Sequence, residues 1–125
     1  MESLAGRRVL VIGLDPHRVA GPWDPVPVAA AIERGMAALH AAGFDAVSCL
    51  VALDGSSDPV SDVRRALDGG PWDCVLVGGG LKGEDDLIEL FEAVVNLART
   101  RAPIAFARRP DDLLAAVLRA TGGRP

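Results

Sequence analysis

The sequence predicts an α/β fold built on a parallel sheet, and three observations support this fold class. Four short apolar runs of strand-forming residues alternate with four segments of helical period. The first and third runs are continuously apolar, which is typical of parallel strands buried on both faces. The order βαβαβαβα calls for right-handed crossover connections. The 125 residues are expected to form a single domain (1–125), with a frayed tail over 121–125.

The first strand and helix are separated by a proline-rich loop. Residues 7–14 form an apolar run suited to a central strand, and residues 15–27 form a loop that four prolines stiffen. A stiff loop at the carboxyl end of a strand suits a wall or lid. Residues 28–42 follow as a helix in an alanine-rich background, with Gly43 as its stop. The apolar stripe of this helix consists of Val28, Ile32, Met36 and Leu39.

The second strand–helix unit has clear end signals. Residues 44–53 form a strand that ends in a turn rich in Gly and Ser. Asp58 or Ser57 is expected to cap the next helix, with Pro59 in its first position. Residues 69–71, Gly-Gly-Pro, end this helix.

The second half of the chain is organised around a strand, a glycine loop and a long helix. Residues 72–77 form the third strand, the loop Gly78–Gly83 follows, and a helix is predicted over 84–100. The apolar residues of this helix cover roughly half of its circumference, more than the ~100° of an ordinary surface helix. They are Leu87, Ile88, Leu90, Phe91, Val94, Val95, Leu97 and Ala98. Either a subunit interface or a neighbouring helix would explain this width.

A short strand and a last helix complete the expected sheet. Residues 103–107 form the fourth strand, and Asp111 is expected to cap a helix that runs to Ala120. Four parallel strands are best arranged in the order 2-1-3-4, so we predict a flavodoxin-like, Rossmann-like αβα sandwich of three layers. Strand order then reverses between the first and third strands, where folds of this kind bind ligands. The sequence thus predicts where a site would lie, but not which reaction it serves.

Composition excludes several classes of function. The net charge of −4 argues against a nucleic-acid surface, and an aromatic content of 4% without Tyr provides no stacking platform for single strands. The first eight residues lack the apolar core of a signal peptide, and no apolar run reaches the ~18 residues of a membrane span. We therefore expect a cytoplasmic protein. Cys49 and Cys74 lie in predicted strands without Cys-x-x-Cys spacing, which indicates buried structural thiols.

Polar residues at the expected switch point favour a site for an anionic small molecule. Cationic side chains would supply charge there, glycines would supply backbone N–H groups, and an Asp–His pair would orient the ligand or transfer a proton. The candidate ligand-binding residues are Asp15, His17, Arg18, Gly79, Gly80, Lys82 and Arg108. Asp15 and His17 are also the candidates for any catalysis.

The glycine loop matches two phosphate-binding motifs incompletely. Gly78, Gly80 and Gly83 fit Gly-x-Gly-x-x-Gly between a strand and a helix, but acidic residues open that helix and would repel a pyrophosphate. About forty residues follow the motif, too few for the second half of a dinucleotide-binding fold. A P-loop requires Lys and Ser or Thr where Glu84 and Asp85 stand. No cofactor is therefore predicted.

The loop after the first strand permits further interpretations. Its Asp15-x-His17 spacing is similar to the Asp-x-His loop of cobalamin-binding domains, in which the His ligates cobalt, but Gly21 falls one residue late for that motif. A phosphoacceptor receiver domain would need a second acidic residue beside Asp15 and a lysine where Arg108 stands. His17 and His40 are too scattered for a zinc site. The remaining interpretation is a solvated His17 beside an Asp15 that accepts hydrogen bonds from nearby backbone.

Short motifs along the chain resemble those of a family of short bacterial α/β proteins labelled hypothetical. The similarity rests on Gly13-Leu14-Asp15-Pro16, on Asp73-Cys74-Val75-Leu76-Val77-Gly78, on Leu90-Phe91-Glu92 with Asn96, and on Ala102-Pro103. It spans most of the chain and implies the flavodoxin-like fold without assigning catalytic residues. The chain departs from the family pattern at Ala107-Arg108, where the family continues the fourth strand with Asn-Thr.

Three functional hypotheses follow from the sequence. The first is a small protein that binds an anionic small molecule at the carboxyl ends of the first and third strands. The second is a non-catalytic homo-oligomer, expected to be a homodimer, or a module that binds a partner protein through the helix at 84–100. The third is an enzyme built on Asp15 and His17, which requires that their side chains meet.

Overall fold

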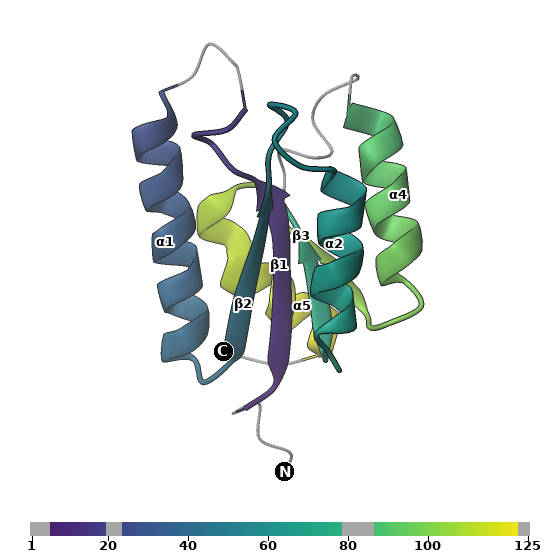
Figure 1. Ribbon diagram of the computed structural model, residues 1–125. Coiled ribbons are helices and arrows are strands. Elements are labelled where there is room, and N and C mark those ends of the chain that lie inside the picture. The colour runs from purple at the N-terminus through teal and green to yellow at the C-terminus, as the bar shows by residue number, and fades with distance from the viewer. Residues whose placement is uncertain (1–5, 20–23, 79–86, 123–125) are drawn as a thin grey trace.

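The computed structural model describes residues 6–19, 24–78 and 87–122, and it confirms the predicted parallel sheet. Its strands lie in the order β2-β1-β3-β4: β1 (Arg8–Leu14), β2 (Asp45–Val51), β3 (Cys74–Val77) and β4 (Ile104–Phe106). The helices are α1 (Pro25–Ala41), α2 (Pro59–Asp68), α4 (Ile88–Ala98) and α5 (Leu113–Thr121), with a 3₁₀ turn η2 (Pro110–Asp112) before α5 (Figure 1). None of the helices in the described part combines the length and hydropathy that a membrane crossing needs.

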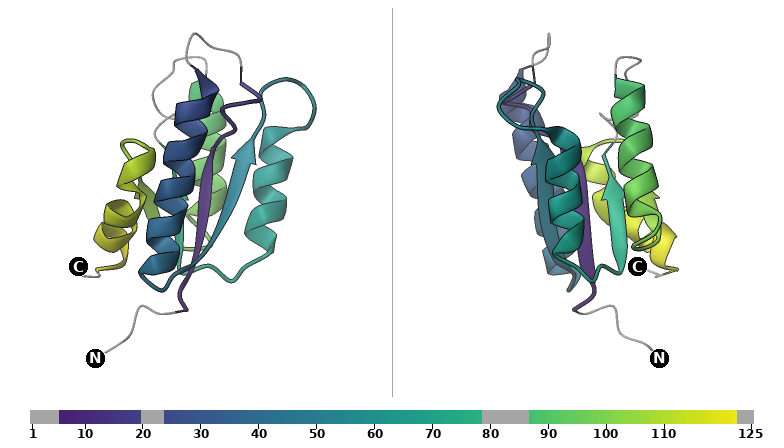
Figure 2. Two further views of the ribbon diagram at one scale, coloured as in Figure 1. Left: turned by 90° about the vertical axis from the view of Figure 1, so that its left-hand side faces the viewer. Right: turned by 45° about the vertical axis from the view of Figure 1, so that its right-hand side comes forward.

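Two of the described helices cover each face of the sheet, so the core has two halves. α1 and α5 pack on one face, whereas α2 and α4 pack on the other. In the right-hand view of Figure 2, α2 and α4 lie in front of the sheet and α1 and α5 lie behind it. Residues 9–12 of β1 are at most 3% exposed, because this strand has neighbours on both edges and helices on both faces.

Helix α1 begins three residues earlier than the sequence predicts, and this shortens the proline-rich loop. Asp24 is its N-cap, and the Asp24 Oδ1 atom accepts a hydrogen bond from the Val26 N–H at 3.0 Å. Pro25 and Pro27 lie in the first turn, where the N–H groups of a helix have no intrahelical partner, so proline is tolerated there. The prediction that these two prolines belong to the loop is therefore wrong. The predicted stop at Gly43 agrees with its φ of 94°.

The last helix starts and ends differently from the prediction. Asp111 does not cap it, because η2 comes first and the Asp111 Oδ1 atom pairs with the Arg109 Nε atom at 2.8 Å. The helix also includes Thr121, whose hydroxyl donates a hydrogen bond to the Val117 carbonyl oxygen at 2.8 Å. The predicted frayed tail is thus wrong at residue 121. Gly122 ends the helix with a φ of 72°, and residues 123–125 lie outside the described residues.

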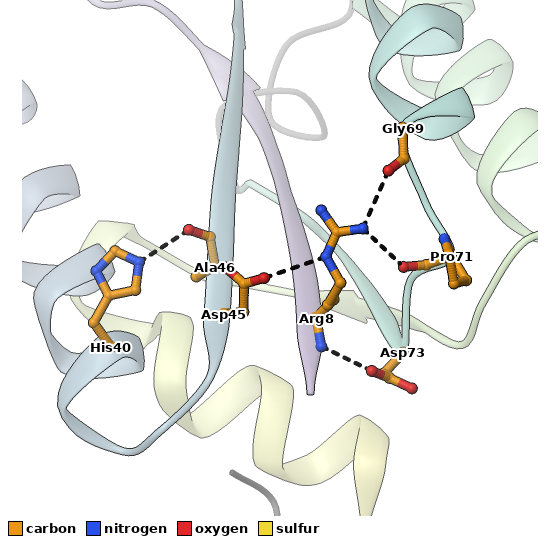
Figure 3. Close-up of polar contacts among 7 residues, drawn as sticks. All are labelled: Arg8, His40, Asp45, Ala46, Gly69, Pro71 and Asp73. Carbon is orange, nitrogen blue, oxygen red and sulfur yellow. Dashed lines mark hydrogen bonds and ion pairs between the residues drawn. The ribbon is translucent and has the colours of Figure 1, made fainter. Parts of the chain in front are cut away.

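Arg8 connects three segments at the amino ends of the strands (Figure 3). Its backbone N–H donates a hydrogen bond to Asp73 Oδ2 at 2.7 Å, and its Nε atom donates to Asp45 Oδ2 at 3.3 Å. Its Nη1 atom donates to the Gly69 carbonyl oxygen at 3.1 Å. These bonds fix the starts of β1 and β2 and the α2–β3 connection together. They lie at the amino ends of the strands, whereas the predicted site lies at the carboxyl ends.

Both cysteines lie in strands, as the sequence predicts. Cys74 is fully buried, and this burial raises the pKa of its thiol to about 11. Cys49 is partly buried, and desolvation, followed by the nearby Asp62 charge, raises its pKa as well. The expected burial is confirmed for Cys74 and is incomplete for Cys49. Raised pKa values suit structural thiols rather than reactive ones.

Helix α1 passes so close to η2 that its residue 35 has room for glycine alone. A Cβ atom added at Gly35 would lie 2.3 Å from the Pro110 carbonyl oxygen and 2.7 Å from Leu113 Cδ1. We expect Gly35→Ala to lower the free energy of unfolding by about 1–3 kcal/mol, as at other overpacked sites, although alanine has the higher helix propensity. Urea denaturation followed by circular dichroism measures this difference.

Gly13→Ala is the matched control for this substitution. A Cβ atom added at Gly13 would meet Leu50 Cδ2 at 3.6 Å, which is an ordinary van der Waals contact. We expect that variant to differ from the wild type by less than about 1 kcal/mol. Equal stabilities of Gly35→Ala and the wild type would contradict the close approach of α1 and η2.

Candidate functional site

The chain that leaves β1 continues alongside the chain that leaves β2. The Asp15 N–H donates a hydrogen bond to the Val51 carbonyl oxygen at 2.9 Å. Further on, the Leu53 N–H donates to the Arg18 carbonyl oxygen at 3.1 Å. The contact between these two chains thus extends beyond the ends of the strands. Backbone bonds therefore fix residues 15–18, here called the β1 loop, on the β2 side of the sheet.

The pairing of β1 with β3 ends sooner, at Ile12 and Val77. The Gly78 N–H donates one more hydrogen bond to the Ile12 carbonyl oxygen at 2.8 Å. A Cβ atom at Gly78 would lie 3.3 Å from that oxygen and 3.5 Å from the Gly13 Cα atom, so β3 remains close against β1 up to this residue. Beyond Gly13 the β1 chain still bonds to β2, because Leu14 pairs with Val51 and the Asp15 N–H bonds to the Val51 carbonyl oxygen. Among the described residues, the contact between the β1 and β3 chains thus ends at Gly13 and Gly78, where the strand order reverses.

Asp15 accepts its hydrogen bond from backbone rather than from the imidazole of His17. Its Oδ1 atom lies 3.0 Å from the His17 backbone nitrogen, and the Arg18 N–H donates to the Asp15 carbonyl oxygen at 3.0 Å. These bonds close a tight turn in which Pro16 is buried and the His17 side chain is exposed. Among the described residues, no hydrogen bond joins the Asp15 carboxylate to the His17 ring. This geometry agrees with a solvated histidine and does not orient His17 as a general base.

Arg18 is tied to the loop after β2. Its Nε atom lies 3.7 Å from Asp54 Oδ2, and its Nη2 atom donates a hydrogen bond to the Ser56 hydroxyl oxygen. Asp54 Oδ1 in turn accepts hydrogen bonds from the Ser56 N–H at 3.0 Å and from the Ser56 hydroxyl at 2.5 Å. Asp54 therefore compensates part of the positive charge of Arg18, a residue that the sequence predicts to bind the ligand.

The contacts of Asp54 and Ser56 with Arg18 are not among those predicted from the sequence. A signal was present, because parallel pairing brings the residues after β1 next to those after β2. An arginine after one strand and an aspartate after its neighbour could have been paired on that ground. The Ser56 hydroxyl and N–H, and then the Arg18 charge, hold the pKa of Asp54 below its ordinary value.

Arg108 follows β4, on the other side of β3 from the β1 loop. The preceding residue is held to β3, since the Ala107 N–H donates to the Val77 carbonyl oxygen at 3.1 Å. The Arg108 N–H donates to Asp112 Oδ2 at 3.1 Å, and this bond is the main cause that lowers the pKa of Asp112. The Arg108 side chain is exposed. No described residue forms an ion pair with its guanidinium, although its charge also lowers the pKa of Asp112.

The other candidate residues fall outside the part of the chain that the structure describes. Gly79, Gly80 and Lys82 all lie within residues 79–86. Within 6–19, 24–78 and 87–122, no three His, Cys, Asp or Glu side chains are grouped closely enough to hold a metal ion. The described part of the candidate site therefore consists of Asp15, His17, Arg18 and Arg108.

Helix α4 is partly covered by its own chain. Val94 and Ala98 are fully buried in the core half that α2 shares, and Phe91 packs against the same core. Ile88, at the start of the helix, is 54% exposed. Phe106 of β4 is 40% exposed, and its ring centroid lies 5.9 Å from that of Phe91. A neighbouring helix and the sheet thus account for part of the apolar stripe, while exposed apolar side chains remain beside it.

Comparisons with known proteins found no relative of this chain. No protein-family model, no curated protein and no solved structure matches it. The candidate site is therefore interpreted from its own residues.

The hydrogen bonds around Asp54 predict how much each of two substitutions changes the pKa of this carboxyl group. We expect Asp54 to titrate below the ordinary aspartate range, and Ser56→Ala to raise its pKa more than Arg18→Ala does, because the Ser56 bonds are the larger causes. Carbon-detected NMR titration of the side-chain carboxyl group measures each value. Since the folded-state pKa is lowered, this carboxylate stabilises the fold above its ordinary pKa, and the contribution is lost as the pH falls through the folded-state pKa. An ordinary pKa for Asp54 in the wild type would contradict the arrangement.

Proposed function

We propose that this protein binds an anionic small molecule at the carboxyl ends of β1 and β3. The observation that carries the proposal is the reversal of strand order between β1 and β3, at the point where their described contact ends, Gly13 and Gly78. The β1 loop is held to the β2 side, while the chain after β4 stays with β3. Ligands of open parallel sheets bind outside the carboxyl ends of the strands, at the point where the strand order reverses.

Among the described residues at these strand ends, one arginine is left without an ion pair, whereas the carboxylates are partly engaged within the chain. The carboxylates of Asp15, Asp54 and Asp112 each accept a hydrogen bond from a backbone N–H group, so their acceptor capacity is partly used within the chain. Arg18 is compensated by Asp54, and Arg109 by Asp111. The Arg108 guanidinium is exposed and forms no ion pair with a described residue. Among the described arginines that follow β1 and β4, it is the one available to a ligand.

The spacing of the strands suits a small ligand. Neighbouring strands lie about 4.8 Å apart, so the ends of β1 and β4, with β3 between them, lie roughly 10 Å apart. In the proposed complex, Arg108 binds the anionic group in a bidentate manner. His17 donates a hydrogen bond from the β1 side, and the Gly78 backbone lies between the two.

Helix α4 supports a second proposal, a surface that binds a partner protein. The exposed Ile88 and the exposed Phe106 lie on elements that contact each other through Phe91. Exposed apolar side chains that gather in one place are typical of interaction sites. This proposal needs no ligand at the carboxyl ends of the strands, and substitution of Ile88 tests it separately.

Titration with inorganic phosphate, followed by proton–nitrogen NMR spectra, tests the anion site. We expect saturable shifts of the amide signals of residues 13–18, Gly78 and Arg108, with the signals of Asp45 and Asp73 at the opposite edge unchanged. Arg108→Ala should weaken binding at least about tenfold, because a hydrogen bond to a charged group contributes about 1.5–3 kcal/mol.

Arg109→Ala is the matched control, since it removes the same charge from the next residue, whose guanidinium already pairs with Asp111 at 2.8 Å. We expect that variant to bind phosphate within about twofold of the wild type. The anion site would be refuted if phosphate caused no saturable shifts at this edge, or if the two substitutions had equal effects.

A further inference from the structure

The outer edge of β2 is an open hydrogen-bonding surface. β2 is the first strand of the sheet and pairs with β1 along one edge (Figure 1). The Asp45 N–H and the Val51 carbonyl both bond to the β1 side. Backbone groups of alternate residues point to the same edge of a strand, so Ala46, Ser48 and Leu50 direct their N–H and C=O groups outwards.

One of these outward backbone groups already has a hydrogen-bond partner within the chain. The His40 Nε2 atom lies 2.9 Å from the Ala46 carbonyl oxygen, as Figure 3 shows. Because a carbonyl oxygen has two lone pairs, this bond leaves one of them available. Among the described residues, no hydrogen bond reaches the backbone groups of Ser48 or Leu50 on this edge.

The two edges of the sheet differ in how they are protected. β4 has three residues, and the Arg119 Nη2 atom donates to the Phe106 carbonyl oxygen at 3.1 Å, so that edge is short and partly covered. β2 has seven residues, Asp-Ala-Val-Ser-Cys-Leu-Val, without the lysine or proline that usually blocks an edge strand. Its one charged residue, Asp45, is paired with Arg8 at 3.3 Å. β2 is therefore the edge that another strand can join.

We propose that a second copy of this chain binds to the outer edge of β2, antiparallel to it, and joins the two four-stranded sheets into one. The strand is self-complementary about Ser48. With Ser48 opposite the partner's Ser48, the two residues exchange both of their hydrogen bonds. Ala46 and the partner's Leu50 then form the next hydrogen-bonded pair on each side. Each outward N–H or C=O group of β2 then faces an outward backbone group of the partner's β2.

The side chains match in the same register. On one face of the joined sheet, Val47, which is 40% exposed, is placed opposite the partner's Cys49. On the other face, Ser48 is placed opposite the partner's Ser48. Apolar pairs across an antiparallel ladder stabilise it by roughly 0.2–1 kcal/mol each, and no like charges stand opposite each other. A two-fold axis through Ser48 thus produces an isologous contact, the commonest form in homodimers.

Charges on α2 also complement each other across this axis. Helix α2 runs antiparallel to β2 (Figure 1), and the Cys49 thiol lies 3.9 Å from the Asp62 carbonyl oxygen, so Asp62 lies level with Cys49. Arg65 lies about 4.5 Å further along the helix, close to the level of Val47. The partner's Cys49, and with it the partner's Asp62, is placed at that same level. The exposed Arg65 guanidinium, now 3.3 Å from its own Asp62, therefore lies on the same face of the joined sheet as the partner's Asp62 and close to its level along the strands.

Sedimentation velocity over a range of protein concentrations tests this dimer. We expect a reversible dimer, and we expect Val47→Lys to raise its dissociation constant at least about tenfold, because an edge lysine blocks strand addition. Ser48→Pro should have the same effect by removing an outward N–H, which an edge strand tolerates. Unchanged circular dichroism and urea denaturation of Val47→Lys would show that the monomer still folds.

Ile88→Lys is the matched control, because it places the same charge on the exposed apolar side of α4. Dissociation by Val47→Lys and not by Ile88→Lys supports the β2 interface. A protein that stays monomeric at millimolar concentration overturns the proposal, as does a dimer that Ile88→Lys alone dissociates. If both substitutions weaken the dimer, hydrogen exchange decides: slow exchange of the Ser48 and Leu50 amides in the wild-type dimer supports the proposal, and fast exchange overturns it.

Discussion

The burial of β1 on both faces and both edges is the constraint on which the rest of the structure depends. An apolar strand of this kind must have a neighbour on each edge to satisfy its backbone, and helices on each face to exclude water. The register with β2 runs from Arg8 to Leu14, whereas that with β3 ends at Ile12. Beyond Gly13, the described chain after β1 therefore forms its backbone bonds on the β2 side. The position of the candidate site is thus a consequence of how β1 is paired.

The two ends of the strands are held in contrasting ways. At the amino ends, Arg8 bonds to Asp45, Asp73 and the end of α2, and its guanidinium stacks 4.3 Å from the centroid of the Trp72 ring. Such a stack adds a favourable cation–π contact to the hydrogen bonds. At the carboxyl ends, residues 15–18 bond to the chain at the end of β2, and Ala107 bonds to Val77 at the end of β3. The described amino ends are therefore tied together through one side chain, and the described carboxyl ends through backbone bonds between neighbours.

The fold could be predicted from the sequence because its signals are local and repeated. Continuous apolar runs marked the central strands, and the alternation with helical segments then restricted the topology to the observed order. Helix starts were harder to predict, because proline is compatible with both a loop and a first helical turn, as Pro25 and Pro27 show. The cap at Asp111 failed for a related reason, since that carboxylate pairs with Arg109 instead.

The candidate site was less predictable, because side-chain partners depend on contacts that sequence spacing does not reveal. The switch point could be located from strand order alone. The pairing of Arg18 with Asp54 required knowing that two loops run together beyond the sheet. In the same way, Asp15 and His17 are close in sequence, yet the carboxylate is taken by the backbone N–H of His17. Proximity along the chain therefore did not produce contact between the functional groups.

The tight turn from Asp15 to Arg18 has a thermodynamic consequence. Its backbone is held by bonds to Val51 and Leu53, and its arginine is held by Asp54 and Ser56. Ordering a free loop on binding costs roughly 1–2 kcal/mol per residue in conformational entropy. Here much of that entropy is already lost during folding, so the turn from Asp15 to Arg18 at the candidate site is preorganised. A ligand would meet a surface already close to its bound shape, and even weak individual contacts could then produce measurable affinity.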